Sequence, residues 1–118
     1  MSFRDVLGVV TDEERDGYVR MSLKTNESHG NIHGTVHGAV IFALVDTAFE
    51  EVSNQKRRAV ALNVNITFRR PVTIGDTLTV EAIEESPGKI TSLYHIVVRD
   101  SKGLIVAVAS ALSYSREG

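Results

Sequence analysis

Cysteine is absent from the 118 residues, which excludes disulfides, thiolate metal sites and a cysteine nucleophile and is consistent with a reducing cytosol. The 13 Lys and Arg against 15 Asp and Glu leave no strong basic field, so duplex nucleic acid is a poor candidate partner. No apolar stretch approaches the roughly 18 residues of a membrane span, and the N-terminus lacks the basic and apolar runs of a secretion signal. We therefore expect a soluble, cytoplasmic protein that binds neither membrane nor nucleic acid.

The composition is that of an ordinary globular chain. At 118 residues, with 42% hydrophobic and 24% charged residues and no low-complexity segment, residues 1–118 suit one domain. Residues Tyr18 to Lys24 alternate strictly between apolar and polar side chains, and the apolar run Val6 to Val10 precedes them. We expect both to be strands, joined by the charged segment Thr11 to Gly17, whose Asp16-Gly17 pair is typical of a hairpin turn.

The rest of the chain divides into a loop, a helix and further strands. Residues Thr25 to Gly38 carry three His, three Gly and two Asn without an apolar period, which predicts a loop of special conformation. Residues Ala39 to Val52 have apolar side chains around nearly the whole circumference and predict a buried helix. Period-two alternation then runs from Ala59 to Phe68, with Val60, Leu62, Val64, Ile66 and Phe68 on one face.

Short turns separate the last predicted strands, which are Thr77 to Glu85, Ile90 to Arg99 and Leu104 to about Tyr114. The predicted order of elements is therefore two strands, one buried helix and an antiparallel meander of strands. One helix cannot cover several long strands unless the sheet curls around it. We therefore predict an α+β fold in which a curled antiparallel sheet wraps around one long central helix.

Asp46 is the first candidate for chemistry. Asp is a poor residue for a helix interior, and here it lies among Leu44, Val45, Ala48 and Phe49, where an ionised carboxylate loses solvation. A structural interpretation is that Asp46 points along a polar seam to a capping or ion-pair partner. We favour a functional carboxylate because the helix is buried and an unusual loop precedes it.

The start of the same helix is the second candidate. Free backbone N–H groups near Gly38, at the positive end of the helix dipole, can bind an oxygen that becomes negative during attack on a carbonyl. Asn31 offers a side-chain amide as a second donor, and Gly34 allows a backbone conformation that other residues resist. The sequence therefore predicts an oxyanion hole at this point.

The spacing of these two candidates has a consequence for quaternary structure. Gly38 and Asp46 are eight residues apart, which separates their backbones by about 12 Å on one helix. Both groups can serve one carbonyl only if Asp46 of one subunit meets Gly38 and Asn31 of another, with two central helices side by side and antiparallel. On this hypothesis the active site exists only in a homodimer.

The motif around these residues resembles that of a known family. His37-Gly38-Ala39 is followed by Asp46, and Gly34 and Asn31 come three and six residues before His37. This pattern is similar to N-x-x-G-x-x-H-G-G followed by L-x-D in the hotdog-fold acyl-CoA thioesterases of the phenylacetate-degradation (PaaI-like) type, in the 4-hydroxybenzoyl-CoA thioesterase superfamily. The resemblance extends to Phe68-Arg69-Arg70-Pro71 and Gly75-Asp76 and, in element order, to nearly the whole chain.

The resemblance implies hydrolysis of an acyl-CoA thioester to free acid and CoA. It implies that Asp46 is the nucleophile or the base for water, that the Gly38 N–H polarises the carbonyl, and that Asn31 and His37 order the site. It also implies a dimer of dimers, so we expect a homotetramer. No metal is implied, and no cofactor beyond the coenzyme A that is part of the substrate.

Two positions depart from the family pattern. Ala39 replaces the second Gly of His-Gly-Gly, a change that a helical position accepts readily. Some relatives place a Ser or Thr near the start of the strand after the helix to hold the attacking water, and Ala61 stands there in this sequence. Asn63 is a candidate substitute, and the attacking group stays open between Asp46 and water.

Other ionisable residues have a functional and a plain interpretation. Glu50 could share the face of Asp46 and raise its pKa, but we favour Glu50 and Glu51 as the solvated end of the helix. His29, His33 and His37 recur every fourth residue, yet Gly30 and Gly34 disfavour a helix there, and we predict no metal. For the CoA phosphates we select three cations from the basic residues: Arg57, Arg58 and Lys89.

Two alternative functions remain open on the same fold. A hydratase or dehydratase would use a catalytic His with a carboxylate, but His37-Gly38-Ala39 lacks the Pro-Gly context associated with hotdog dehydratases. A non-catalytic acyl-CoA sensor would bind intact substrate without turnover, and Ala61 adds weight to it. The sequence does not identify the acyl group.

Overall fold

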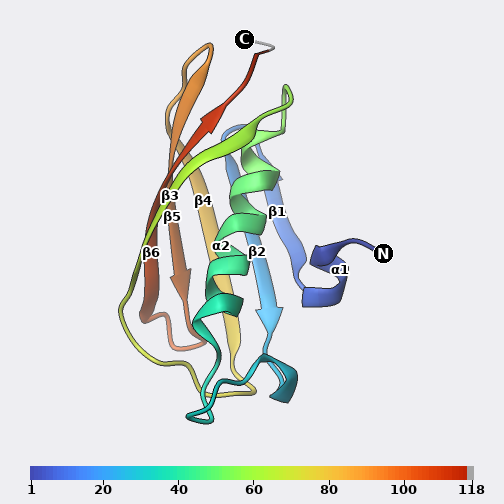
Figure 1. Cartoon of the computed structure of the whole chain (residues 1–118), viewed down its shortest axis with the longest axis vertical. Coiled ribbons are helices and arrows are strands. Elements are labelled where there is room, and N and C mark those ends of the chain that lie inside the picture. Colours follow the sequence, from blue (N-terminus) through green and yellow to red (C-terminus); the bar gives the residue numbers. More distant parts are fainter. Residues whose placement is uncertain (117–118) are drawn as a thin grey trace.

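The computed structural model describes residues 1–116, and one long helix and six strands dominate it (Figure 1). In chain order the elements are α1 (Phe3–Leu7), β1 (Val10–Arg15), β2 (Tyr18–Lys24), the 3-10 turn η1 (Glu27–His29), α2 (Gly38–Ser53), β3 (Val60–Phe68), β4 (Thr77–Ser86), β5 (Thr91–Arg99) and β6 (Ile105–Tyr114). None of the helices in residues 1–116 is long and apolar enough to cross a membrane.

The six strands form one antiparallel sheet in the order β1-β2-β4-β5-β6-β3. The sheet curls behind α2, which packs against β2, β3, β4, β5 and β6 through the concave face (Figure 1). This architecture is the hotdog fold, a curled sheet wrapped around a central helix. The predicted fold class is therefore confirmed.

The core lies between α2 and the concave face of the sheet. On the helix, the side chains of Leu44, Val45 and Ala48 have no exposed surface. Full burial of a Leu or Val side chain contributes roughly 1.5–3 kcal/mol, so this interface fixes the position of α2. The strand residues with no exposed surface that complete it include Val19, Met21, Leu78, Val80, Ala82, Ile96, Val98 and Val106.

The N-terminal segment differs from the prediction. Residues 3–7 form the short helix α1, held by a capping box between Ser2 and Asp5 and ended by Gly8 at a positive φ of 92°. The predicted strand over Val6 to Val10 is therefore wrong, and the strand β1 lies within the charged segment instead. Charged side chains suit β1 because it is an edge strand whose residues are almost all exposed. The Asp16-Gly17 turn is confirmed, with Gly17 at φ 73°.

The strand β3 also differs from the prediction, both in its position in the sheet and in which side chains share one face. It lies at the edge beside β6 instead of beside β4, so only β4, β5 and β6 form a meander. A register shift between Ala61 and Asn63 moves the alternation by one residue. Val60 pairs with Tyr114 on the outer face, whereas Ala61 and Val64 pair with the buried Ser113 and Ala111 on the concave face.

The sequence predicts a helix that is buried around nearly its whole circumference, but α2 also has an exposed face. Four residues at intervals of three or four form an exposed stripe opposite the sheet: Ala39, Phe42, Asp46 and Glu50. Exposed apolar side chains also follow the edge strand β3, where the exposed fraction is 63% for Val60, 55% for Leu62 and 49% for Phe68. The edge strand thus exposes apolar side chains, and the stripe on α2 exposes two apolar residues and two carboxylates.

Candidate active site

The side chain of Asn31 makes three hydrogen bonds within the loop before α2. Asn31 Oδ1 accepts hydrogen bonds from the backbone N–H groups of His33 (2.9 Å) and Thr35 (3.0 Å). Its Nδ2 donates to Thr35 Oγ1 at 2.9 Å, which leaves the second amide hydrogen for a substrate. Gly34 has a φ of 81°, the left-handed conformation anticipated for this residue. Asn31 therefore shapes the loop and retains one donor.

His37 is the N-cap of α2. Its Nδ1 accepts a hydrogen bond from Ala39 N–H at 3.0 Å, and its own N–H donates to the carbonyl of His29 at 2.7 Å. Because Nδ1 is the acceptor, the proton of the neutral imidazole lies on Nε2, where it can be donated to a ligand. The buried His29 has a separate structural role, since its Nδ1 accepts from Asn26 N–H at 3.0 Å, while His33 is exposed.

Gly38 supplies the free amide of the helix start. His37 takes the Ala39 N–H, but the Gly38 N–H has no acceptor within residues 1–116. The ring of Phe68 lies over this point, 3.6 Å from where a Cβ on residue 38 would be. The amide thus lies at the positive end of a 16-residue helix beside an apolar ring, an environment that strengthens its interaction with an oxyanion.

Asp46 lies on the exposed stripe of α2, two turns further along the helix. It lines a cavity of about 170 Å³ together with Ser2, Phe3, Arg4, Thr47 and Glu50. The side chain still reaches solvent, yet enough protein surrounds the carboxylate that burial raises its pKa. Burial is the cause of this shift, and the proximity of Glu50 is not needed to explain it.

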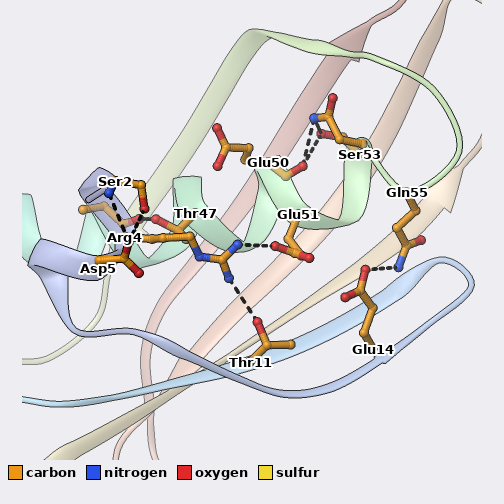
Figure 2. Close-up of polar contacts among 12 residues, drawn as sticks. Ser2, Arg4, Asp5, Thr11, Glu14, Thr47, Glu50, Glu51, Ser53 and Gln55 are labelled. Atoms are coloured by element: carbon orange, nitrogen blue, oxygen red, sulfur yellow. Dashed lines mark hydrogen bonds and ion pairs between the residues drawn. The ribbon is translucent and has the colours of Figure 1, made fainter.

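The two acidic residues that follow Asp46 differ from each other. Glu50 is exposed and lines the same cavity as Asp46. The prediction that Glu51 belongs to a solvated helix end is wrong. Glu51 forms an ion pair with Arg4 and accepts a hydrogen bond from it at 2.5 Å. Figure 2 shows Arg4 reaching from α1 to Glu51 on α2, and its second nitrogen donates to Thr11 on β1 at 3.0 Å.

Of the four predicted catalytic residues, His37 and Gly38 lie at the start of α2, and Asn31 lies in the loop before it. Asp46 is eight positions after Gly38 on the same helix, about 12 Å away. No residue between 31 and 38 lines the cavity beside Asp46. One chain therefore presents two candidate half-sites, one with hydrogen-bond donors and one with a carboxylate.

Of the cations predicted to bind the CoA phosphates, Arg57 and Lys89 lie near each other. Arg57 donates to the carbonyl of Gly88, next to Lys89 in the turn between β4 and β5. Arg57 also lines a cavity of about 250 Å³ with the neighbouring Lys56. Lys89 and Arg58 are exposed.

Sequence reasoning missed the part of the site that α1 contributes. Ser2, Phe3 and Arg4 border the Asp46 cavity, although the sequence had assigned no role to them. The signal was present as Ser2 followed three residues later by Asp5, the pattern of a capping box. The apolar run Val6 to Val10, which is typical of a strand, outweighs this capping-box pattern in the sequence.

Comparison with known proteins shows the family. Residues 33–107 match the thioesterase superfamily. The chain is 36% identical to a "Putative esterase" of Deinococcus radiodurans (84% of this chain, 68% of the relative) and 32% identical to a "Putative esterase" of Archaeoglobus fulgidus (86% and 67%).

Solved structures share the fold. The PaaI protein of the E. coli phenylacetic acid degradation operon superimposes with a TM-score of 0.94 at 32% identity, covering 98% of this chain and 84% of that protein. A Streptococcus mutans protein solved bound to acetyl CoA has the same fold at 24% identity and a TM-score of 0.88, covering 91% and 87%. The chain therefore belongs to the thioesterase superfamily as a PaaI-like member with the hotdog fold, and it is a thioester hydrolase.

Proposed function

We propose that the protein hydrolyses acyl-CoA thioesters at a site shared between two protomers. The observation that carries this proposal is the separation of the two half-sites on one exposed helix face. Asp46 is too far from the Gly38 N–H of its own chain to act on the same carbonyl, and it points away from the core. A second α2, antiparallel to the first, would bring each Asp46 to the other chain's Gly38.

The edge strand β3 supports such a pairing. Arg69 N–H donates to the carbonyl of Val106 on β6 at 2.7 Å, and hydrogen-bonding direction alternates along an antiparallel strand. The N–H and C=O groups of Val64, Ile66 and Phe68 therefore face the free edge. Two β3 strands pairing antiparallel would satisfy these groups, cover the exposed apolar side chains and place the two α2 helices side by side.

The chemistry follows from the groups that would meet. Gly38 N–H and the remaining Asn31 amide hydrogen would bind the thioester oxygen as negative charge develops on it. Asp46 would attack the carbonyl carbon, or take a proton from the water that attacks it. In the water route the carbon–sulfur bond then breaks to give the free acid, and the CoA thiolate takes the proton that Asp46 removed from water. In the direct route carbon–sulfur cleavage would leave an anhydride between the acyl group and Asp46, which a water molecule would then hydrolyse to the free acid. Burial favours proton uptake by Asp46, because it raises the pKa of this carboxyl.

The cations Arg57, Arg58 and Lys89 would hold the CoA phosphates, and two dimers would form a homotetramer. Arg57 and Lys89 fit this role best, since the hydrogen bond from Arg57 to Gly88 joins the two segments that carry these charges. CoA is the carrier to test first, because a protein of the same fold has been solved bound to acetyl CoA. In this proposal CoA belongs to the substrate and is not a resident cofactor.

Release of free thiol from acetyl-, octanoyl- and phenylacetyl-CoA tests the proposal. We expect turnover of at least one substrate, and a loss of about 100-fold or more in kcat for Asp46→Asn, the usual size of a general-base effect. Asp12→Asn is the matched control, since Asp12 is an exposed aspartate on β1. Intact substrates throughout, or equal rates for Asp46→Asn and wild type, would contradict the proposal.

A further inference from the structure

The proposed shared site determines where a twofold axis would cross α2. If Asp46 of one protomer meets Gly38 of its partner, symmetry requires the reverse contact as well. In two antiparallel helices related in this way, the axis crosses each helix midway between these residues, at position 42. Phe42 occupies this position, on the same exposed stripe as Asp46, and 38% of its surface is exposed.

The edge strand β3 gives a second estimate of the axis position. The strand runs opposite to α2, and its Phe68 ring lies 3.6 Å from where a Cβ on Gly38 would be (Figure 1). Phe42 is four residues beyond Gly38, about 6 Å along the helix, and this rise corresponds to roughly two residues of a strand. Counting back from Phe68 by this amount leads to Ile66.

An axis at Ile66 pairs two β3 edges completely. The backbone groups of Val64, Ile66 and Phe68 face the free edge of the sheet. Antiparallel pairing centred on Ile66 places Ile66 opposite its own copy and Val64 opposite the partner's Phe68, so all three residues find partners within this set. A centre one residue earlier would place Phe68 opposite Leu62 in the bulge, and one residue later would place Val64 opposite Arg70, beyond the strand. The helix and the strand therefore indicate the same axis.

We infer that Phe42 lies on the twofold axis of the dimer and packs against its own copy, which sets the register in which each Asp46 meets the partner's Gly38. The inference deepens the proposed function and rests on it. In this register Ala39 is level with residue 45 of the partner, next to the partner's Asp46. The aromatic pair fills the gap between the helices, whereas the small Ala39 leaves space beside the carboxylate for the thioester carbonyl. Phe42 is thus a positioning residue.

Single cysteines can report this register because the chain has none of its own. A residue on the axis faces its own copy, and a disulfide needs Cα atoms roughly 4.4–6.8 Å apart, so Phe42→Cys should form a covalent dimer on mild oxidation. Ala39→Cys and Asp46→Cys are matched controls on the same stripe. Each control residue is displaced from its own copy, by about 9 Å and about 12 Å along the helices, so both should cross-link at least about tenfold more slowly. Non-reducing gels over time give the rates.

Thiol release gives a second measurement, which separates positioning from simple packing. We expect Phe42→Ala to lower kcat about tenfold, because a shift of the register moves Asp46 away from the reacting carbonyl. Phe42→Leu keeps a large apolar side chain on the axis and should recover most of this loss. The side chain is partly exposed in one chain, so neither variant should prevent folding, which circular dichroism checks.

Three results would overturn the inference. They are cross-linking of Ala39→Cys or Asp46→Cys as fast as that of Phe42→Cys, a wild-type protein that sediments as a monomer, and an unchanged kcat in Phe42→Ala. Failure of the proposed function is a different result, in which the wild type releases no thiol from any acyl-CoA whatever the cross-linking pattern.

Discussion

Mixing two inactive variants would test the shared active site directly. Asp46→Asn removes the carboxylate half-site, and Asn31→Ala removes the side chain that shapes the donor half-site through three hydrogen bonds. Each variant alone should lose about 100-fold or more in kcat. In a mixed dimer, the intact Asp46 of one chain meets the intact Asn31 loop of the other, so one site of the two is restored.

The magnitude follows from this geometry. If chains assort at random, half of the dimers are mixed and each has one working site, so an equimolar mixture should recover about a quarter of wild-type activity. The assay is thiol release after the two variants, carrying different affinity tags, are unfolded and refolded together. Doubly tagged dimers are then isolated by two successive purifications. If these mixed dimers were no more active than the parent variants, the site would not be shared.

Three further predictions concern the carboxylate, the loop and the cations. Burial raises the pKa of Asp46, so the ionised form costs stability in the folded protein, and the stability present at low pH is lost as pH rises through the raised pKa. Asp46→Asn should therefore melt roughly 1–3 °C above wild type at pH 7, with the difference vanishing near pH 3 in calorimetry. Gly34→Ala places a Cβ at a φ of 81° with no atom within 4 Å, so we expect a loss of about 1–2 kcal/mol in urea unfolding from backbone strain alone. An unchanged free energy of unfolding would contradict this prediction, because it would mean that the loop relaxes without strain. Replacing Arg57 and Lys89 by Gln should raise KM for an acyl-CoA several-fold but leave the corresponding acyl-pantetheine unaffected, because only the former has the nucleotide phosphates. An equal effect on both thioesters would remove these residues from the CoA site.

Much of the fold was accessible from the sequence because the central elements are buried on one regular face. The alternation in Tyr18 to Lys24 and the apolar surface of Ala39 to Val52 both reflect burial, and both elements were predicted within one or two residues. The lone Asp46 in that helix and the loop before it, with its hydrogen-bond donors, also led to the prediction of two half-sites, which stays a prediction. Their separation on one helix was predictable from helix geometry.

The remainder depends on features that leave little trace in apolar periodicity. The strand β1 is an edge strand exposed on both sides, so nothing selects an apolar face there. The bulge near Leu62 shifts the alternation of β3 without any Gly or Pro to mark it. The contribution of α1 to the Asp46 cavity depends on a contact between residues that are more than 40 positions apart, which local patterns cannot show.

His37 caps the start of α2 through its imidazole, and the proposed function gives the same side chain a second role in ordering the site. His37→Ala removes the imidazole and also frees the Ala39 amide at the first helical turn, so a kinetic defect in this variant would mix two causes. Asn at this position would keep an acceptor for the helix start but lose the imidazole. Comparing the two replacements separates what the side chain does for the scaffold from what it does for turnover.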